Sequence, residues 1–327
     1  VKVPEVEDLA GFVKAIRASG LVGLGGASFP THIKFNPRNI DDVHTLIVNA
    51  AECEPFITSD HRLMLEDAED LIAGCQLVMQ YIGLDEGYIG IEENKMDAIE
   101  HLDKLLAAKG ITNIKTFKLQ ARYPKGAERV LVYEITGKTM NAGVLPADLG
   151  IILSNVTTIA FVGQYFRNGM PLINKRMTID GDAVATPKNV IAPLGTMIND
   201  VIAFCDGYKQ EPRKILMGGP MMGRAIFSDE MPIVKNNNAI LAFSKEQALV
   251  KEETACINCG RCHNACPFKL IPTALADAYD RRDAEALSRL KVMQCMECGS
   301  CSFICPARRP LGFINKLGKA VVKEAGL

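Results

Sequence analysis

The chain has 327 residues, a formal net charge of −1 and 48% hydrophobic residues, which is typical of a soluble globular protein with two to three domains. No uncharged apolar run is long enough to span a bilayer, and the near-neutral charge excludes a general attraction to nucleic acid or anionic lipid. The chain begins at Val1 without a basic-then-apolar leader, so we expect a fragment or a processed form in a reducing compartment, where its 11 cysteines persist as thiols.

The first patterned segments are a predicted helix and a glycine-rich loop. Apolar residues recur at helical spacing over residues 5–19, and Gly20 follows as a stop signal. Residues 23–34 then read GLGGASFPTHIK. This loop is not a dinucleotide fingerprint, because Ser28 occupies the last glycine position and a helix precedes it. Its glycines let the backbone approach a flat or phosphorylated ligand, with Lys34 as a cation, although a turn that only packs is an open alternative.

Strands and helices then alternate, which predicts a parallel, Rossmann-like sheet. The expected elements are a buried strand at 45–50, a helix at 59–82, a strand at 87–91, a helix at 96–108 and a strand at 114–119. Ligands bind beyond the carboxyl ends of strands in such sheets, so Asn49, Glu52 and Glu54 are candidate contacts. Solvated loop carboxylates are the alternative for the two glutamates.

The middle of the chain predicts one more helix, one more strand and then a change of architecture. Residues 123–129 form a turn into a helix that ends near Thr136, a suitable place for an anionic group. A strand lies within 145–158, and from about Ile159 short strands, turns and one helix near 197–205 suggest a β-grasp module. We therefore expect domains at 1–158, 159–247 and 248–327.

The strongest motif is a pair of cysteine runs near the end of the chain. Each run reads C-x-x-C-x-x-C-x-x-x-C-P, the spacing of bacterial ferredoxins, in which the fourth cysteine of one run ligates the cluster of the other. We expect two [4Fe–4S] clusters. The ligand sets are Cys256, Cys259, Cys262 and Cys305 for one cluster, and Cys295, Cys298, Cys301 and Cys266 for the other.

Two alternatives for the cysteines fit less well. Structural zinc needs two cysteine pairs rather than two quartets that each end in Cys-Pro, and a disulfide framework is not expected in a chain long enough to form apolar cores. Between the runs, apolar residues recur at helical spacing, from Leu275 to Met293, so we expect an α-helical ferredoxin module. Residues 251–327 hold 12 Lys and Arg against 8 Asp and Glu, and this positive charge partly offsets anionic clusters.

The segments 23–32, 49–62, 123–128 and 218–223, together with both cysteine runs, resemble the C subunits of Rnf complexes. These complexes are membrane-bound ferredoxin:NAD oxidoreductases that couple electron transfer to sodium or proton pumping. The resemblance implies a peripheral protein on the cytoplasmic side of the membrane, with other Rnf subunits and NAD(H) as partners. Ferredoxin would be reached indirectly, through a partner in the complex, and no nucleic acid is expected. The family usually has a further N-terminal barrel-sandwich region.

The front half also resembles the NADH-oxidising flavoprotein of respiratory complex I, which binds FMN and NADH on a Rossmann-like domain. The resemblance implies that Phe29 stacks on the nicotinamide and that Glu54 and Glu128 lie near the dinucleotide. The FMN contacts that it implies are Gly23, Gly25, Gly26, Lys34, Asn49, Glu52, Tyr123, Gly126, Asn155 and Thr158. The chain departs from complex I at Leu24, Ala127 and Ser154, where that family has Arg, an acidic residue and Asn.

A function follows from the pairing of cofactors. Nicotinamide exchanges a hydride whereas an iron–sulfur cluster takes one electron, and a flavin can exchange with both. We expect FMN to exchange hydride with NAD(H) and the two clusters to carry single electrons, with no side-chain acid or base. The alternatives are a flavin and iron–sulfur cobalamin reductase of similar architecture, and a non-enzymatic dicluster adaptor that relays electrons to a membrane partner.

Overall fold

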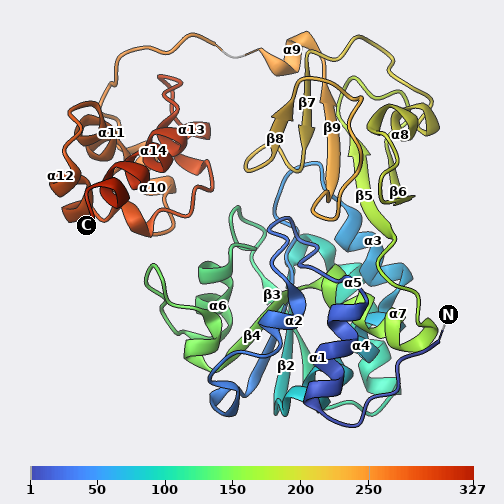
Figure 1. The fold of residues 1–327 in the computed structure, drawn as a ribbon. Coiled ribbons are helices and arrows are strands. Elements are labelled where there is room, and N and C mark those ends of the chain that lie inside the picture. Colours follow the sequence, from blue (N-terminus) through green and yellow to red (C-terminus); the bar gives the residue numbers. More distant parts are fainter. Residues whose placement is uncertain (1, 250) are drawn as a thin grey trace. The chain divides into compact units, whose positions relative to one another are not determined.

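A computed structural model describes residues 2–249 and 251–327. The chain divides into two compact units, which are described separately (Figure 1). One unit runs up to Met140 and continues over Val144–Ala248, and the other comprises Asn141–Gly143 and Leu249–Leu327. Among the described residues, none of the helices combines the length and apolar character that a bilayer span requires.

The first unit contains a four-stranded parallel sheet, which confirms the Rossmann-like expectation. Its strands are β1 (Thr45–Ala50), β2 (Glu86–Glu92), β3 (Ile114–Leu119) and β4 (Ile151–Asn155), in the order β3-β2-β1-β4. Val48 in the centre pairs with Ile89 on one side and Ser154 on the other. Because all four strands run the same way, their carboxyl ends meet at one edge of the sheet.

Helices connect and cover these strands (Figure 1). They are α1 (Leu9–Ala18), α2 (Thr31–Lys34), α3 (Ser59–Glu66), α4 (Ala68–Ile82), α5 (Met96–Ala108), α6 (Glu128–Thr136) and α7 (Val156–Asn168), with short 3-10 turns at Ile40–Asp42, Glu93–Lys95 and Pro146–Leu149. Glycines bring α4 and α7 together: a Cβ on Gly74 would lie 2.0 Å from the Ile159 carbonyl oxygen, and one on Gly163 equally close to that of Asp70. Only glycine permits this approach.

Three predicted elements differ from the structure. The helix expected at 5–19 begins at Leu9, because Asp8 caps it by accepting a hydrogen bond from the Gly11 amide. The helix expected at 59–82 is two helices that meet at Asp67. Residues after Ile159 do not turn into short strands but continue α7 to Asn168, with Val156, Ile159 and Val162 buried in the core. The β-branched run at the start of α7 suggests strand, and packing against α4 overrides that preference.

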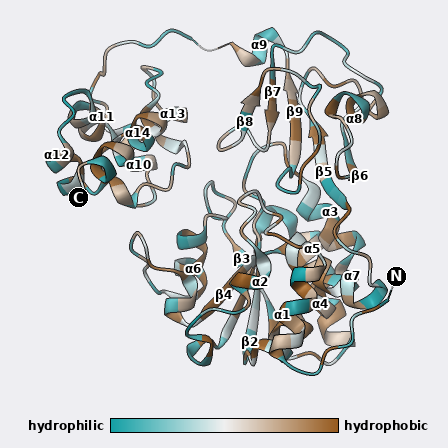
Figure 2. Ribbon diagram, in the orientation of Figure 1, coloured by the Kyte–Doolittle hydropathy of each residue, from teal (hydrophilic) through white to brown (hydrophobic). Residues whose placement is uncertain are grey.

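A five-stranded mixed sheet completes the first unit. It comprises β5 (Asn174–Asp180), β6 (Lys188–Pro193), β7 (Lys214–Met217), β8 (Arg224–Ile226) and β9 (Ala239–Phe243), in the order β6-β5-β9-β7-β8. The first and last strands are parallel and central, and α8 (Ile198–Phe204) contributes Ile198, Val201 and Ile202 to the core, which matches a β-grasp arrangement. Apolar residues concentrate on β7 and β9 (Figure 2). The helix α9 (Lys245–Ala248) ends the unit.

The second unit is helical, as expected. It contains α10 (Arg261–Ala265), α11 (Pro272–Asp280), α12 (Ala284–Arg289), a 3-10 turn (Val292–Gln294), α13 (Ser300–Phe303) and α14 (Leu311–Glu324). No strand occurs in the described residues 251–327. Leu275, Leu287 and Val292 form the core together with Val322 of α14. Gly318 allows α14 to pack closely there, since a Cβ would lie 3.2 Å from the Leu287 side chain.

Candidate functional site

The carboxyl edge of the parallel sheet brings the candidate flavin contacts together. Asn49, at the end of β1, donates a hydrogen bond of 2.7 Å to the Gly126 carbonyl, and its own amide oxygen accepts from the Ala51 N–H at 3.3 Å. The loop after β3 is thereby fixed to the end of β1. Gly126 has little space for a side chain, because a Cβ there would lie 3.2 Å from both Ala51 Cβ and Cys53 Sγ.

The glycine loop is held over the start of α7. The Leu24 amide donates to Thr158 Oγ1 at 2.9 Å, and the Leu24 carbonyl accepts from Lys175 Nζ at 2.8 Å. A Cβ on Gly25 would lie 3.0 Å from Asn155 Cβ. Lys175 is 2% exposed, and burial lowers its pKa to about 8. Thr158 of α7 and Lys175 of β5 therefore anchor the loop, and Asn155 of β4 leaves little room for a side chain at Gly25.

Lys34 lies within the same edge. Its Nζ donates to the Leu153 carbonyl of β4 at 3.0 Å, and an ammonium group has two further N–H donors. Burial lowers the pKa of Lys34, and the charge of Glu128 partly opposes this shift. A half-buried cation with further N–H donors, at the carboxyl edge of a parallel sheet that also holds a glycine loop, suits a ligand that carries anionic or carbonyl groups, so these residues fit FMN.

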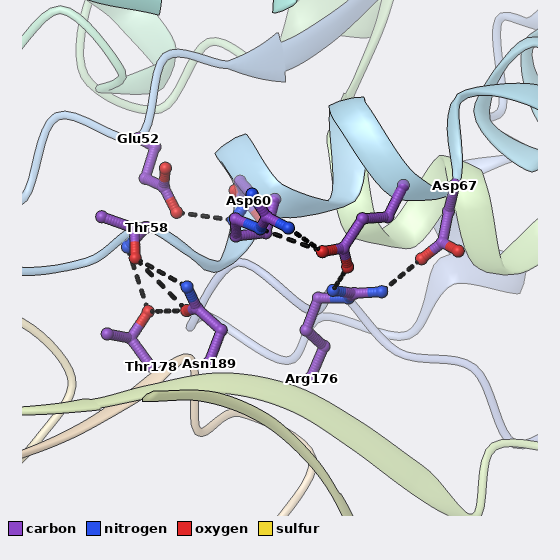
Figure 3. Close-up of polar contacts among 9 residues, drawn as sticks. Glu52, Thr58, Asp60, Asp67, Arg176, Thr178 and Asn189 are labelled. Carbon is purple, nitrogen blue, oxygen red and sulfur yellow. Dashed lines mark hydrogen bonds and ion pairs between the residues drawn. The ribbon is translucent and has the colours of Figure 1, made fainter. Parts of the chain in front are cut away.

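Glu52 stabilises the first turn of α3 rather than facing solvent. Its carboxylate accepts hydrogen bonds from the backbone N–H groups of Asp60 at 2.6 Å and His61 at 3.0 Å (Figure 3). Burial, and secondly the charge of Asp60, raises the pKa of Glu52 well above its usual value. Asp60 in turn accepts from Asn155 Nδ2 at 2.8 Å and Thr157 Oγ1 at 2.6 Å. Asp60 therefore connects Glu52 and Asn155, which are both predicted flavin contacts.

Both ends of α3 also contact the β-grasp sheet. The Thr58 amide donates to Thr178 Oγ1 at 3.0 Å, and Arg176 forms ion pairs with Glu66 at 2.7 Å and Asp67 at 2.5 Å (Figure 3). These bonds join β5 to the helices that follow the end of β1. The β-grasp sheet thus supports the flavin edge from one side.

The residues expected near the dinucleotide are more dispersed. Phe29 is 49% exposed and Glu128 is exposed in the first turn of α6, whereas Tyr123, which is predicted to contact FMN, is half-buried. Glu54 accepts backbone hydrogen bonds from Met221 at 3.0 Å and Met222 at 2.8 Å, in the loop between β7 and β8. Their roles toward NAD(H) stay predictions.

A buried charged pair at the same edge was not predicted. Lys95 Nζ donates to the Ala51 carbonyl at 2.9 Å and lies 3.5 Å from Glu92 Oε2, and both side chains are at most 7% exposed. Among the described residues, Glu92 Oε1 has no hydrogen-bond partner, and burial raises the pKa of Glu92. The sequence did offer one signal for this pair, the position of Glu92. It is the last residue of β2, just as Asn49 lies near the end of β1.

The cysteines gather around two cavities in the second unit. One cavity is lined by Cys256, Cys259, Cys262 and Cys305, and the other by Cys266, Cys295, Cys298 and Cys301. These are the two sets that the crossed spacing predicts. Their role as ligands stays a prediction, because proximity alone does not show a bond to iron.

The cavities fit a polynuclear cluster. Four cysteines line each cavity, and among the described residues no three His, Cys, Asp or Glu side chains form a site for a single metal ion. Backbone N–H groups donate to sulfur from Asn258 to Cys256 and from Glu297 to Cys295, each at 3.4 Å. Burial raises the pKa of Cys301 to about 12, so iron must displace its proton on binding. The donor set and shape fit [4Fe–4S].

Fold and sites define a protein with a flavin-binding domain followed by an iron–sulfur domain. Residues 16–164 match the Nuo51 FMN-binding domain family, and residues 248–306 match the 4Fe-4S dicluster domain family. A crystal structure of an NAD+-reducing [NiFe]-hydrogenase in the H2-reduced state shares the fold, with a TM-score of 0.66 and 19% identity over 97% of this chain and 61% of that chain.

This chain is a relative of the C subunits of ion-translocating ferredoxin:NAD(+) oxidoreductase complexes over most of its length. It is 41% identical to the C subunit of the proton-translocating complex of Clostridium ljungdahlii over 80% of this chain and 56% of the relative. The corresponding values are 39%, 83% and 60% for the C subunit of the Na(+)-translocating complex of Acetobacterium woodii, and 40%, 85% and 53% for that of the ion-translocating oxidoreductase complex of Rhodobacter capsulatus. The chain therefore spans between about half and three fifths of the length of these relatives.

Proposed function

We propose that this chain is the NAD(H)-interacting flavin and iron–sulfur part of a membrane-bound, ion-pumping ferredoxin:NAD oxidoreductase. The observation that carries the proposal is that one chain combines a flavin-binding sheet edge with two four-cysteine cavities. The names of relatives at 39–41% identity support it. We place the chain peripherally on the cytoplasmic side of the membrane, against other subunits of the complex, with ferredoxin reached through one of them.

In this proposal the residues of the sheet edge bind and orient the flavin. The glycine loop and Gly126 approach the ring, Lys34 offers N–H groups to an oxygen or phosphate, and Asn155 and Thr158 fix the loop position. Glu52 and Asn49 hold the surrounding backbone in place. When bound, FMN supplies the conversion between hydride transfer and single-electron transfer. No side-chain general acid or base is needed, because hydride passes directly between the two rings.

NAD(H) then has to stack against the flavin from the exposed side. Phe29 is suited to contact the nicotinamide because its ring is about half exposed beside the glycine loop. Glu54 and Glu128 are proposed to lie near the dinucleotide. We further propose three domains, with the β-grasp domain between the flavin domain and the dicluster domain near 248. The helix α7 carries the flavin domain past residue 158 to Asn168.

An anaerobic NADH titration tests the proposal. The purified protein, loaded with FMN and iron, is followed by visible absorbance for the flavin and by electron paramagnetic resonance for the clusters. We expect NADH to bleach the flavin and the cluster signals to appear with it. Failure to bind any FMN favours the adaptor. Flavin that NADH does not bleach, together with reduction of a corrinoid by another donor, favours the cobalamin reductase.

A further inference from the structure

Asn315 of α14 is a buried polar residue that faces one of the cysteine cavities. It is 2% exposed and lines the cavity that Cys266, Cys295, Cys298 and Cys301 surround. Its Nδ2 donates to Cys295 Sγ at 3.7 Å, a distance within the range for a sulfur acceptor. A side-chain amide in an apolar helix interface is costly unless its hydrogen bonds are made, so its presence calls for a reason.

The orientation of the amide indicates that reason. Asn315 Oδ1 is buried and has no hydrogen-bond partner among the described residues, whereas the NH2 group is directed at sulfur. The opposite orientation would direct oxygen lone pairs at an electron-rich thiolate. Asn315 thus directs its NH2 group at Cys295 Sγ and leaves Oδ1 without a hydrogen-bond partner in the part of the chain that the structure describes. An unsatisfied buried acceptor lowers the stability of the fold, so stability does not explain this arrangement.

Contacts on either side of Asn315 fix α14 against the cysteine loop. The Gly312 amide donates to Ser302 Oγ at 2.8 Å, and Lys319 forms an ion pair with Glu297 at 2.8 Å. Glu297 lies between Cys295 and Cys298 in sequence, so the helix and the loop are held together one turn beyond the amide. The contacts of Gly312 and Lys319 thus fix α14 against the cysteine loop, and this fixes the position of Asn315 beside Cys295.

The other cysteine cavity has a different polar neighbour. Arg309 lines it, and its guanidinium pairs with Glu253 at 3.2 Å, so a carboxylate balances its charge. The Asn258 side chain also lies against Cys256, but there its Oδ1 accepts from Sγ at 3.6 Å, so this amide is not a donor to the sulfur. The two sites therefore differ in the hydrogen bonds that the surrounding side chains offer to sulfur.

We propose that Asn315 raises the reduction potential of the cluster held by Cys266, Cys295, Cys298 and Cys301. Reduction adds one negative charge, which is shared by the cluster and its thiolates, and a hydrogen bond to Cys295 Sγ stabilises the reduced form more than the oxidised form. Asn315 is a positioning residue that acts through Cys295 and makes the two potentials unequal. The inference rests on the proposed ligand set.

The test is an anaerobic redox titration of the full chain, followed by paramagnetic resonance, in wild type and Asn315→Leu. Leucine has a similar volume and no donor. We expect one of the two transitions to move to lower potential, by a tenfold change in the reduction equilibrium, which is about 59 mV for one electron. The other transition should not move. Lys323→Gln, an exposed position in the last turn of the same helix, is the control and should leave both transitions in place.

Iron content separates this inference from the proposed function. Wild-type protein that never holds two clusters would defeat the ligand set, whereas fully loaded Asn315→Leu with both potentials unchanged would overturn the role of Asn315. Asn315→Ala is the second variant, which removes the donor without adding a charge, and should lower the same potential. If both variants lose the iron of one cluster, Asn315 holds the site together instead of tuning it, and the proposal is also overturned.

Discussion

The backbone N–H of Leu24 donates to Thr158 Oγ1 at 2.9 Å, across 134 positions of sequence. The bond ties the glycine loop to the first turn of α7, just beyond the carboxyl end of β4. Thr158 is fully buried, so water cannot replace the hydroxyl if it is removed. The Thr158 side chain is therefore one of two that fix the position of the loop over the flavin edge, the other being Lys175.

Thr158→Val should weaken FMN binding. Valine keeps the shape but leaves the Leu24 amide without its acceptor, at a cost of about 1–1.5 kcal/mol, or roughly a tenfold rise in the dissociation constant. Quenching of FMN fluorescence on titration into flavin-free protein measures it. Thr158→Ser keeps the hydroxyl and is the matched control. Equal affinities for the valine variant and wild type would contradict the role of this bond.

Lys175 donates to the carbonyl of Leu24, and its burial makes the stability of the fold depend on pH. Its folded pKa of about 8 lies below the ordinary lysine value of 10.5, so between these values the unfolded chain binds more protons. The free energy of unfolding should therefore rise with pH across this window, by roughly 3 kcal/mol from Lys175. Below about pH 8 the full cost of burying the charged lysine is present.

The variant Lys175→Met should lack that slope. Urea-unfolding midpoints of flavin-free protein, followed by circular dichroism between about pH 7.5 and pH 10.5, give the comparison. Lys188→Met is the control, because its side chain is 34% exposed and lies on the same sheet. A midpoint that rises equally with pH in wild type and Lys175→Met would rule out the buried lysine as the source.

Local patterns were enough to predict the strands of the first sheet and the cysteine sets. The predicted strand at 114–119 and helix at 96–108 have the bounds of β3 and α5, because periodicity and turn residues are encoded in neighbouring positions. The strand predicted at the start of α7 was wrong because that prediction also depended on neighbouring positions alone. Its run Val156-Thr157-Thr158-Ile159 favours strand locally, and only burial against α4 makes it helical.

The contacts that position the site could not be predicted, because they join distant segments. Lys175 reaches Leu24 across 151 positions, and Asp60 reaches Asn155 across 95. A single sequence does not show which carbonyl Lys175 meets. Glu54 is another such case: its place after β1 suggested a ligand contact, and the structure adds a pair of backbone donors from the loop between β7 and β8.

The contact between Glu54 and that loop can be tested by a double-mutant cycle. A Cβ on Gly219 would lie 2.2 Å from Glu54 Oε2, so Gly219→Ala should displace the carboxylate and destabilise the protein. Glu54→Ala leaves the Met221 and Met222 amides unpaired and should cost about 1–3 kcal/mol. Glu54→Ala removes the carboxylate from the path of the added methyl but leaves the Cβ of residue 54, which would lie 2.7 Å from it. The methyl should therefore cost less in the Glu54→Ala background than in wild type, and the two changes should be non-additive.

Unfolding midpoints of the two single variants and the double variant measure this coupling. FMN affinity is measured in parallel and should stay near the wild-type value, because Glu54 is assigned to the dinucleotide rather than to the flavin. Additive midpoints would show that the loop and Glu54 act independently. Glu54→Gln keeps an acceptor for one of the two loop amides. A rise in the NADH concentration needed for half-bleaching, measured under conditions in which this variant is fully folded, would reveal a separate contact with NAD(H).

The crossed pairing of the cysteines predicts which pairs of substitutions share one cluster. Cys266→Ala should remove the cluster whose other candidate ligands are Cys295, Cys298 and Cys301, since these four line one cavity. Adding Cys295→Ala should then cause no further loss of iron, whereas adding Cys259→Ala should remove the second cluster as well. Iron and sulfide analysis with paramagnetic resonance distinguishes the two. The reverse pattern, with Cys266 and Cys259 belonging to one cluster, would refute the crossing and show that each run holds a cluster by itself.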